Sequence, residues 1–179
     1  MNKEKTSFYF VSFLFYPIPL KILLFILLVF LSDNGYSQRL TTVFHKDYSQ
    51  WRFEGNTIKT AFRGDNDAWN YNKTRIKTVF SDDLNHWRIN NSVNLKTVFH
   101  GDFNTWEISG HDLRFRVRTT FMNDTERWSI LGDLSGSIKT VFSDNYENWD
   151  IDLDFVELHE DLKIAIVFIA IQEAIKHSK

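Results

Sequence analysis

The 179-residue chain has no cysteine, which excludes disulfide bonds, thiolate catalysis and cysteine-ligated zinc sites. It has only 7 glycines, and they form no Gly-rich phosphate-binding loop. The 21 basic and 23 acidic residues give a formal net charge of −2, so the basic excess of a general nucleic-acid binder is missing. We therefore predict no nucleic-acid partner. What the chain has in excess is aromatic residues: 17 Phe, 6 Tyr and 6 Trp.

Long hydrophobic runs are also missing, because the uninterrupted apolar stretch Ile22–Leu31 has only ten residues. Ten residues are too few to span the ~30 Å of hydrocarbon in a bilayer. Three lysines precede this stretch, and the small residues Gly35 and Ser37 follow it. This arrangement predicts a secretory signal peptide at residues 1–37, cleaved between Ser37 and Gln38.

A cleaved signal peptide places the mature chain in the periplasm, in the cell envelope or outside the cell. The alternative is an uncleaved membrane anchor, since residues 8–31 are apolar apart from a few positions such as Pro17, Pro19 and Lys21.

One pattern recurs six times in the rest of the chain: a phenylalanine followed seven residues later by a tryptophan. The six pairs, which use every tryptophan once, are Phe44 with Trp51, Phe62 with Trp69, Phe80 with Trp87, Phe99 with Trp106, Phe121 with Trp128, and Phe142 with Trp149. We call the stretch from each phenylalanine to its tryptophan a Phe-to-Trp segment. Successive phenylalanines lie 18 to 22 residues apart, which suits two short strands and two turns. Residues 38–153 are therefore predicted to hold six copies of a β-hairpin repeat.

The residues around each segment alternate between apolar and polar, with many β-branched side chains, which is typical of strands. The predicted fold is mainly β: an antiparallel meander of about six hairpins, forming a curved sheet or a partial barrel. The alternation puts the phenylalanine and tryptophan anchors together on one aromatic face, which has to be covered.

The C-terminal segment, residues 154–179 of the same domain, is predicted to supply that cover as one α-helix. Residues 157–176 are mostly helix formers without glycine or proline, with acidic residues near the start. Within them, Ile164–Ile171 is apolar on all sides, which implies burial on more than one side. The alternative for this run is a buried strand, because isoleucine and valine dominate it.

Two sets of residues are candidates for binding. A basic stripe on the polar face could bind an anionic glycan or another anionic envelope component; it consists of Lys59, Lys77, Lys96, Arg118 and Lys139. The alternative role for the stripe is a solvated face whose lysines prevent association between sheets. The aromatic residues expected to be most exposed are Tyr48, Phe103 and Tyr146, which occupy the same loop position in three copies.

An aspartate or asparagine stands three residues after each phenylalanine. Asp65, Asp67, Asp82 and Asp83 are weak calcium candidates, but no loop has the spaced carboxylates of a calcium-binding loop. Aspartate and asparagine also accept the backbone N–H two residues on and so shape turns. The sixth copy has Asn145 in place of aspartate and keeps only this second capacity, so we predict turns, with no metal or cofactor.

No catalytic residues are predicted, because the six histidines are scattered and show no metal-binding spacing such as HExxH. The leading hypothesis is an exported, non-enzymatic binding or structural repeat protein of the cell envelope or exterior. One alternative is an enzyme with a pocket between the sheet and the helix, and another is a membrane-tethered protein with an uncleaved N-terminal segment.

Overall fold

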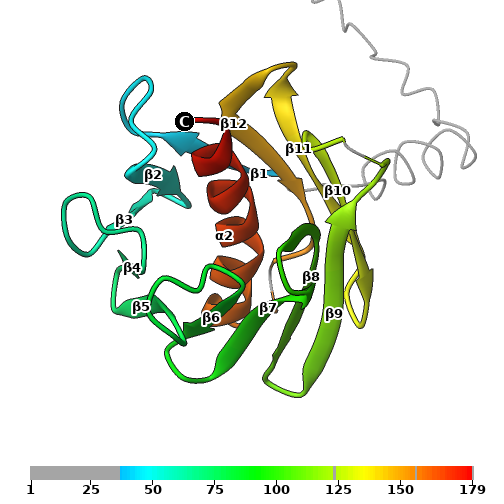
Figure 1. Cartoon of the computed structure of the whole chain (residues 1–179). Helices are drawn as coiled ribbons and strands as arrows, with labels where there is room; N and C mark the ends of the chain where they lie inside the picture. The colour runs from blue at the N-terminus through cyan, green and yellow to red at the C-terminus, as the bar shows by residue number, and fades with distance from the viewer. Residues whose placement is uncertain (1–36, 123, 156, 179) are drawn as a thin grey trace, which may run out of the picture. The chain divides into compact units, whose positions relative to one another are not determined.

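The computed structural model describes residues 37–122, 124–155 and 157–178. In these residues twelve antiparallel strands form a closed barrel around one helix, α2 (Glu160–His177) (Figure 1). The strands are β1 (Ser37–Thr42), β2 (Gln50–Phe53), β3 (Asn56–Thr60), β4 (Ala68–Tyr71), β5 (Thr74–Thr78), β6 (His86–Ile89), β7 (Val93–Phe99), β8 (Asp102–Gly110), β9 (Leu113–Thr119), β10 (Arg127–Gly132), β11 (Gly136–Phe142) and β12 (Asn145–Asp152). The predicted mainly β meander with a C-terminal helix is confirmed, and the sheet closes completely instead of partly.

The barrel is a simple meander in which each strand pairs with its neighbours in sequence. It closes where β1 pairs with β12, with Leu40 opposite Trp149. The predicted signal peptide lies outside the described residues except for Ser37, which begins β1 opposite Asp152. Closure removes the exposed sheet edges at which another chain could add a strand.

The strands follow the alternation in the sequence. In β9, for example, Phe115 and Val117 are buried, whereas Arg114, Arg116 and Arg118 are exposed. The apolar set of every strand thus faces the interior and the charged set forms the outer wall.

The two ends of the barrel carry different connections. At one end the hairpins turn tightly, through residues with positive φ such as Asn90, Asn91, His111 and Asp112. Left-handed residues match the twist of a two-residue hairpin, and asparagine, aspartate and histidine tolerate this conformation better than most residues. At the other end lie the six Phe-to-Trp segments, four of which hold connections of seven residues, whereas the fourth and sixth turn within two residues between long strands. We call these the short-turn end and the long-loop end.

Helix α2 passes through the interior, and its residues are buried almost without break from Asp161 to Ala174. The barrel wall surrounds it, which explains why residues 164–171 are apolar on all sides. Phe168 packs edge-to-face on Trp69 and Trp87, with ring centroids 5.7 and 4.7 Å apart. The helix begins at Glu160 because the side chain of His159 caps it. Among the described residues, no helix combines the length and the apolar character needed to cross a bilayer.

All six tryptophans are buried, but the expectation that the phenylalanine anchors share their face is wrong. Phe44, Phe62, Phe80, Phe99, Phe121 and Phe142 are 58–68% exposed. In the hairpins of β7 with β8 and of β11 with β12, the register shifts between the threonine and the phenylalanine, so regular alternation ends before the phenylalanine is reached.

In three copies, the position beside the tryptophan is taken instead by the aromatic residue four places after the phenylalanine. Tyr48, Phe103 and Tyr146 lie 5.7–6.0 Å from Trp51, Trp106 and Trp149, measured between ring centroids. These three aromatic residues are half-buried against the core, so the expectation that they are the most exposed aromatic residues is also wrong. The loop aromatic side chains and the phenylalanines thus have the reverse of their predicted positions.

Candidate functional site

The long-loop end is built by one repeated set of hydrogen bonds. In every Phe-to-Trp segment, the aspartate or asparagine three residues after the phenylalanine accepts the backbone N–H two residues on, at 2.8–3.0 Å. This is the turn-forming role predicted for these residues. The indole Nε1–H groups of Trp51, Trp69, Trp87, Trp128 and Trp149 donate to the carbonyl three residues earlier, at 2.8–3.0 Å. Each loop is therefore shaped by its own aspartate or asparagine, and five of the six are attached to the barrel wall through their tryptophan.

Neighbouring loops are also bonded to one another. Asp67 Oδ2 accepts the Asp82 N–H at 3.0 Å, and Asn85 Oδ1 accepts the Gly101 N–H at 2.7 Å. The Glu126 carboxylate accepts the Asp144 N–H in the same way.

Glu147 of the sixth segment joins the last loop to the first. Its carboxylate accepts the Lys46 N–H and lies 2.8 Å from His45 Nδ1. Burial alone would raise the pKa of the Glu147 carboxyl, but the hydrogen bonds from Lys46 and His45 outweigh it and lower the pKa. Four of the six neighbouring pairs of segments are thus joined by side-chain hydrogen bonds.

The six exposed phenylalanines lie at this end, and we call them the phenylalanine crown: Phe44, Phe62, Phe80, Phe99, Phe121 and Phe142. The crown and its neighbour Met122 account for seven of the eight exposed large hydrophobic side chains among the described residues. The remaining one is Leu131 on β10.

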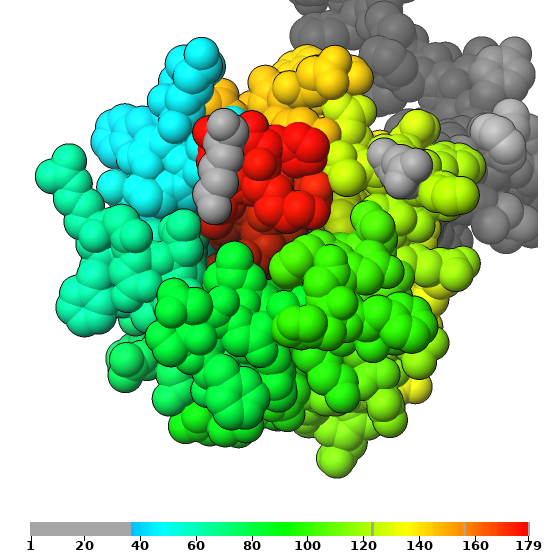
Figure 2. All heavy atoms as spheres, in the orientation of Figure 1, coloured from blue at the N-terminus to red at the C-terminus, as the bar shows by residue number. Residues whose placement is uncertain are grey.

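The centre of the long-loop end is closed by the C-terminal turns of α2, drawn in red in Figure 2. His177 stacks on Tyr146 with ring centroids 3.9 Å apart, and Lys176 Nζ lies 5.3 Å from the Phe103 ring centroid. Glu173, which is 2% exposed, pairs with Lys176 at 2.9 Å and His177 at 3.0 Å. The half-buried loop aromatic residues therefore seal the barrel.

The calcium candidates are partly brought together. Asp65, Asp67 and Asp82 line a hollow of about 260 Å³, whereas Asp83 does not. One oxygen of Asp65 and one of Asp67 already accept backbone N–H groups. Hydrogen bonds from Asn85 to the Asp83 carboxylate lower its pKa.

The outer wall carries a concentrated basic surface on β5–β9. The outward side chains of these five strands include seven cations and one acid, Glu107. We call this surface the basic face, and its cations are Arg75, Lys77, Arg88, Lys96, Arg114, Arg116 and Arg118. It lies in a chain whose formal net charge is −2, so its positive charge is a local feature.

Glu107 organises the centre of the basic face. Arg114 Nη2 lies 2.9 Å from both carboxylate oxygens, and Lys96 Nζ lies 3.5 Å from Oε1. Burial of Glu107 works to raise its pKa, but Arg114 and Lys96 outweigh burial and lower the pKa of the carboxyl. The single acid thus stays ionised and holds the surrounding cations in place.

Two hollows open on the basic face. One of about 520 Å³ is lined by polar and charged side chains of Thr105, Glu107, Arg114, Arg116 and Arg118, together with Leu131. The other, of about 290 Å³, is lined by Arg75, Lys77, Arg88, Asn90 and Asn91.

The predicted basic stripe is only partly grouped in space. Lys77, Lys96 and Arg118 belong to the basic face, whereas Lys59 lies on β3 and Lys139 on β11, where Lys139 faces Asp150. Sequence reasoning did not select Arg75, Arg114 or Arg116. The alternation of arginine with apolar residues in Leu113–Thr119 was the signal that could have found two of them.

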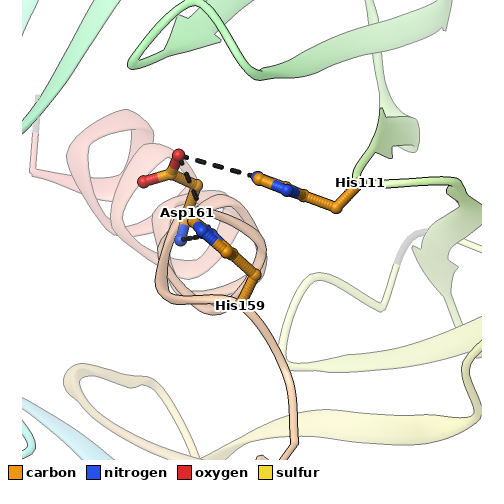
Figure 3. Close-up of side chains that lie close together, drawn as sticks. All are labelled: His111, His159 and Asp161. Atoms are coloured by element: carbon orange, nitrogen blue, oxygen red, sulfur yellow. Dashed lines mark hydrogen bonds and ion pairs between the residues drawn. The ribbon is translucent and has the colours of Figure 1, made fainter.

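The short-turn end holds a cluster of His111, His159 and Asp161, shown in Figure 3. Asp161 is 4% exposed, and its carboxylate accepts hydrogen bonds from Asn90 Nδ2, at 3.0 Å, and from Ser92 Oγ. His111 Nε2 and His159 Nδ1 lie 3.8 and 3.9 Å from Asp161 Oδ2. The cluster thus ties the first turn of α2 to two hairpin turns.

These three side chains form the group of described residues that could hold a metal ion, since their ligand atoms lie within 4.8 Å of one another. The two imidazole rings are stacked 3.7 Å apart with planes only 20° from parallel. Lone pairs in parallel planes do not converge on one point, and His159 Nδ1 already accepts the Asp161 N–H at 3.2 Å. Metal binding would require at least one ring to rotate, so the arrangement serves best as an anchor for the helix.

Comparison of the chain with protein families, curated proteins and solved structures finds no match.

Proposed function

We propose that this protein is an exported, non-enzymatic binding module of the cell envelope or exterior, built from six hairpin repeats, and that its basic face binds an anionic glycan. The observation that carries the proposal is the ratio of seven cations to one acid on the outward positions of β5–β9. Like charges on adjacent strands destabilise a sheet, as where Lys77 stands directly opposite Arg88. A polyanion bound along the face relieves this repulsion.

The chemistry of the face suits sulfate or carboxylate groups. Arginine presents a planar fork of donors that binds such groups in a bidentate manner. Arg114, Arg116 and Arg118 project from one strand beside a hollow of about 520 Å³, which gives acidic groups of a chain molecule a place to enter. Leu131 in the same hollow offers an apolar contact for the flat face of a sugar ring.

Two further features support this class of function. The basic and apolar pattern of residues 1–37 is that of an export signal. The space between wall and helix, where an enzyme pocket was the alternative, is packed with the six tryptophans and the apolar side chains of α2.

The test is binding to dextran sulfate, with uncharged dextran as the comparison, at about 0.15 M salt, where the Debye length is about 8 Å. Replacing Arg114, Arg116 and Arg118 by glutamine removes three charges from the face. We expect at least a tenfold loss of affinity, because a single charge-assisted contact is worth about 1.5 kcal/mol or more.

The matched control carries Lys59→Gln, Arg127→Gln and Lys139→Gln, which remove the same charge outside the basic face. We expect this control to bind nearly as well as the parent protein. Equal losses in the two variants, or no binding of dextran sulfate by the parent, would reject the proposal.

A further inference from the structure

The phenylalanine crown is an apolar surface that the fold itself leaves uncovered. Its six side chains are each 58–68% exposed. An aromatic side chain buries about 150–250 Å² when fully packed, so the crown offers roughly 700 Å² of apolar area. This approaches the ~800 Å² that each partner contributes to a standard protein–protein interface. Isolated exposed apolar residues need no explanation, but six at one end of the molecule do.

The loops that carry the phenylalanine crown are ordered by hydrogen bonds within the chain itself. The carboxylates and amides of the loops accept backbone N–H groups within each loop, and Glu147 connects the sixth loop back to the first. The tryptophan indoles attach the loops to the barrel wall. A surface ordered in advance loses less conformational entropy on binding, which favours affinity.

The negative charge of the residues between the phenylalanines and the tryptophans indicates the kind of partner. The residues between phenylalanine and tryptophan in the six segments include ten acids but only three lysines or arginines, a net charge of −7. This acidic surround repels an anionic membrane and attracts cations. It also contrasts with the basic face, which lies on the outer wall and not at this end.

We infer that the phenylalanine crown binds a second protein through a segment in which apolar side chains alternate with lysine or arginine. The apolar side chains of that segment pack on the phenylalanines, and its cations reach the carboxylates between them. Arg127 already shows the cation contact within the chain, with its guanidinium carbon 5.1 Å from the Phe121 ring centroid. This inference concerns a surface separate from the basic face and does not depend on the glycan proposal.

The probe is an 18-residue amphipathic peptide of leucine and lysine, titrated against the full-length protein. A leucine–glutamate peptide tests the need for positive charge, and a serine–lysine peptide tests the need for apolar side chains. We expect the leucine–lysine peptide to bind at least tenfold more tightly than either of the others.

The decisive variant carries Phe62→Ser, Phe80→Ser and Phe99→Ser. These side chains are exposed, so the variant should keep the melting temperature of the parent protein. We expect at least a tenfold loss of affinity for the leucine–lysine peptide, since aromatic anchors dominate interface energetics. The control is Leu131→Ser, which removes an exposed apolar side chain outside the crown and should leave the affinity for the leucine–lysine peptide unchanged.

Three results would overturn the inference. The first is unchanged peptide binding by the triple variant that has folded normally. The second is tighter binding to vesicles of anionic lipid than to the peptide. The third is crown-dependent self-association of the parent protein in sedimentation experiments, which would make a second copy of the chain the partner. Loss of dextran sulfate binding in the Arg114, Arg116 and Arg118 variant leaves the crown intact, so the two proposals fail separately.

Discussion

Phe168 lies at the centre of the barrel, and replacing it by alanine tests the packing of α2 against the wall. The side chain is fully buried and contacts Trp69 and Trp87 edge-to-face. A buried Phe→Ala substitution costs about 3–5 kcal/mol, and each aromatic pair adds about 0.5–1.5 kcal/mol beyond burial. Because the wall surrounds the helix and cannot collapse into the cavity, we expect a loss of about 5 kcal/mol.

The loss can be measured by urea unfolding followed through tryptophan fluorescence, since all six tryptophans are in the core. With a denaturant slope of about 2 kcal/mol per molar urea, a loss of about 5 kcal/mol moves the midpoint down by roughly 2.5 M. The matched control is Phe80→Ala, the same change at a residue that is 65% exposed. We expect it to alter stability by no more than about 0.5 kcal/mol.

The losses of stability in Phe168→Ala and Phe80→Ala together test whether α2 is enclosed by the barrel wall. A loss below about 2 kcal/mol for Phe168→Ala would show that the helix is not enclosed as described. A loss of similar size for Phe80→Ala would mean that the phenylalanines of the Phe-to-Trp segments pack in the core after all.

Two further predictions concern buried carboxylates. Glu107 has a lowered pKa in the folded state, so it contributes stability above its unfolded pKa, near 4.5, that is lost as the pH falls through the folded pKa. Glu107→Gln should therefore flatten the decline of melting temperature between pH 5 and about 3, and an unchanged decline would contradict the role of Arg114. Asp161→Asn should cost about 1–3 kcal/mol in urea unfolding, because it removes a buried charge that favours the helix N-terminus and accepts bonds from Asn90 and Ser92. Glu160→Gln, an exposed acid in the same turn, is the control and should change stability by no more than about 0.5 kcal/mol.

The fold could be predicted from the sequence wherever one face of an element is buried. Alternation in the strands and the all-round apolar run in α2 both report burial directly, and both predictions are confirmed. Closure could not be predicted in the same way, because it depends on the pairing of β1 with β12, more than a hundred residues apart.

The positions of the phenylalanines could not be predicted because alternation holds only within regular pairing. The register shift after Thr97 and after Thr140 comes before the phenylalanine, and nothing in the apolar pattern marks it. The apolar loop residue that replaces the phenylalanine beside the tryptophan varies between copies, from Tyr48 to Leu84, so it gives a weaker signal.

The His111–His159–Asp161 cluster could not be predicted from the sequence, for a different reason. Its members come from a hairpin turn and a helix start that are 48 residues apart in the chain. They come together only because α2 runs through the barrel. The spacing of residues along the sequence gives no sign of this arrangement.

The meander also explains how a chain with a net charge of −2 can carry a basic face and an acidic long-loop end. Strand residues form the wall and connecting residues form the end, so cations placed in β5–β9 and acids placed in the Phe-to-Trp segments are separated by topology alone. A ligand on the wall and a partner at the end therefore do not compete for the same residues. The two surfaces adjoin where β5, β7 and β9 run into the segments of Phe80, Phe99 and Phe121, so each surface is tested by variants of its own residues.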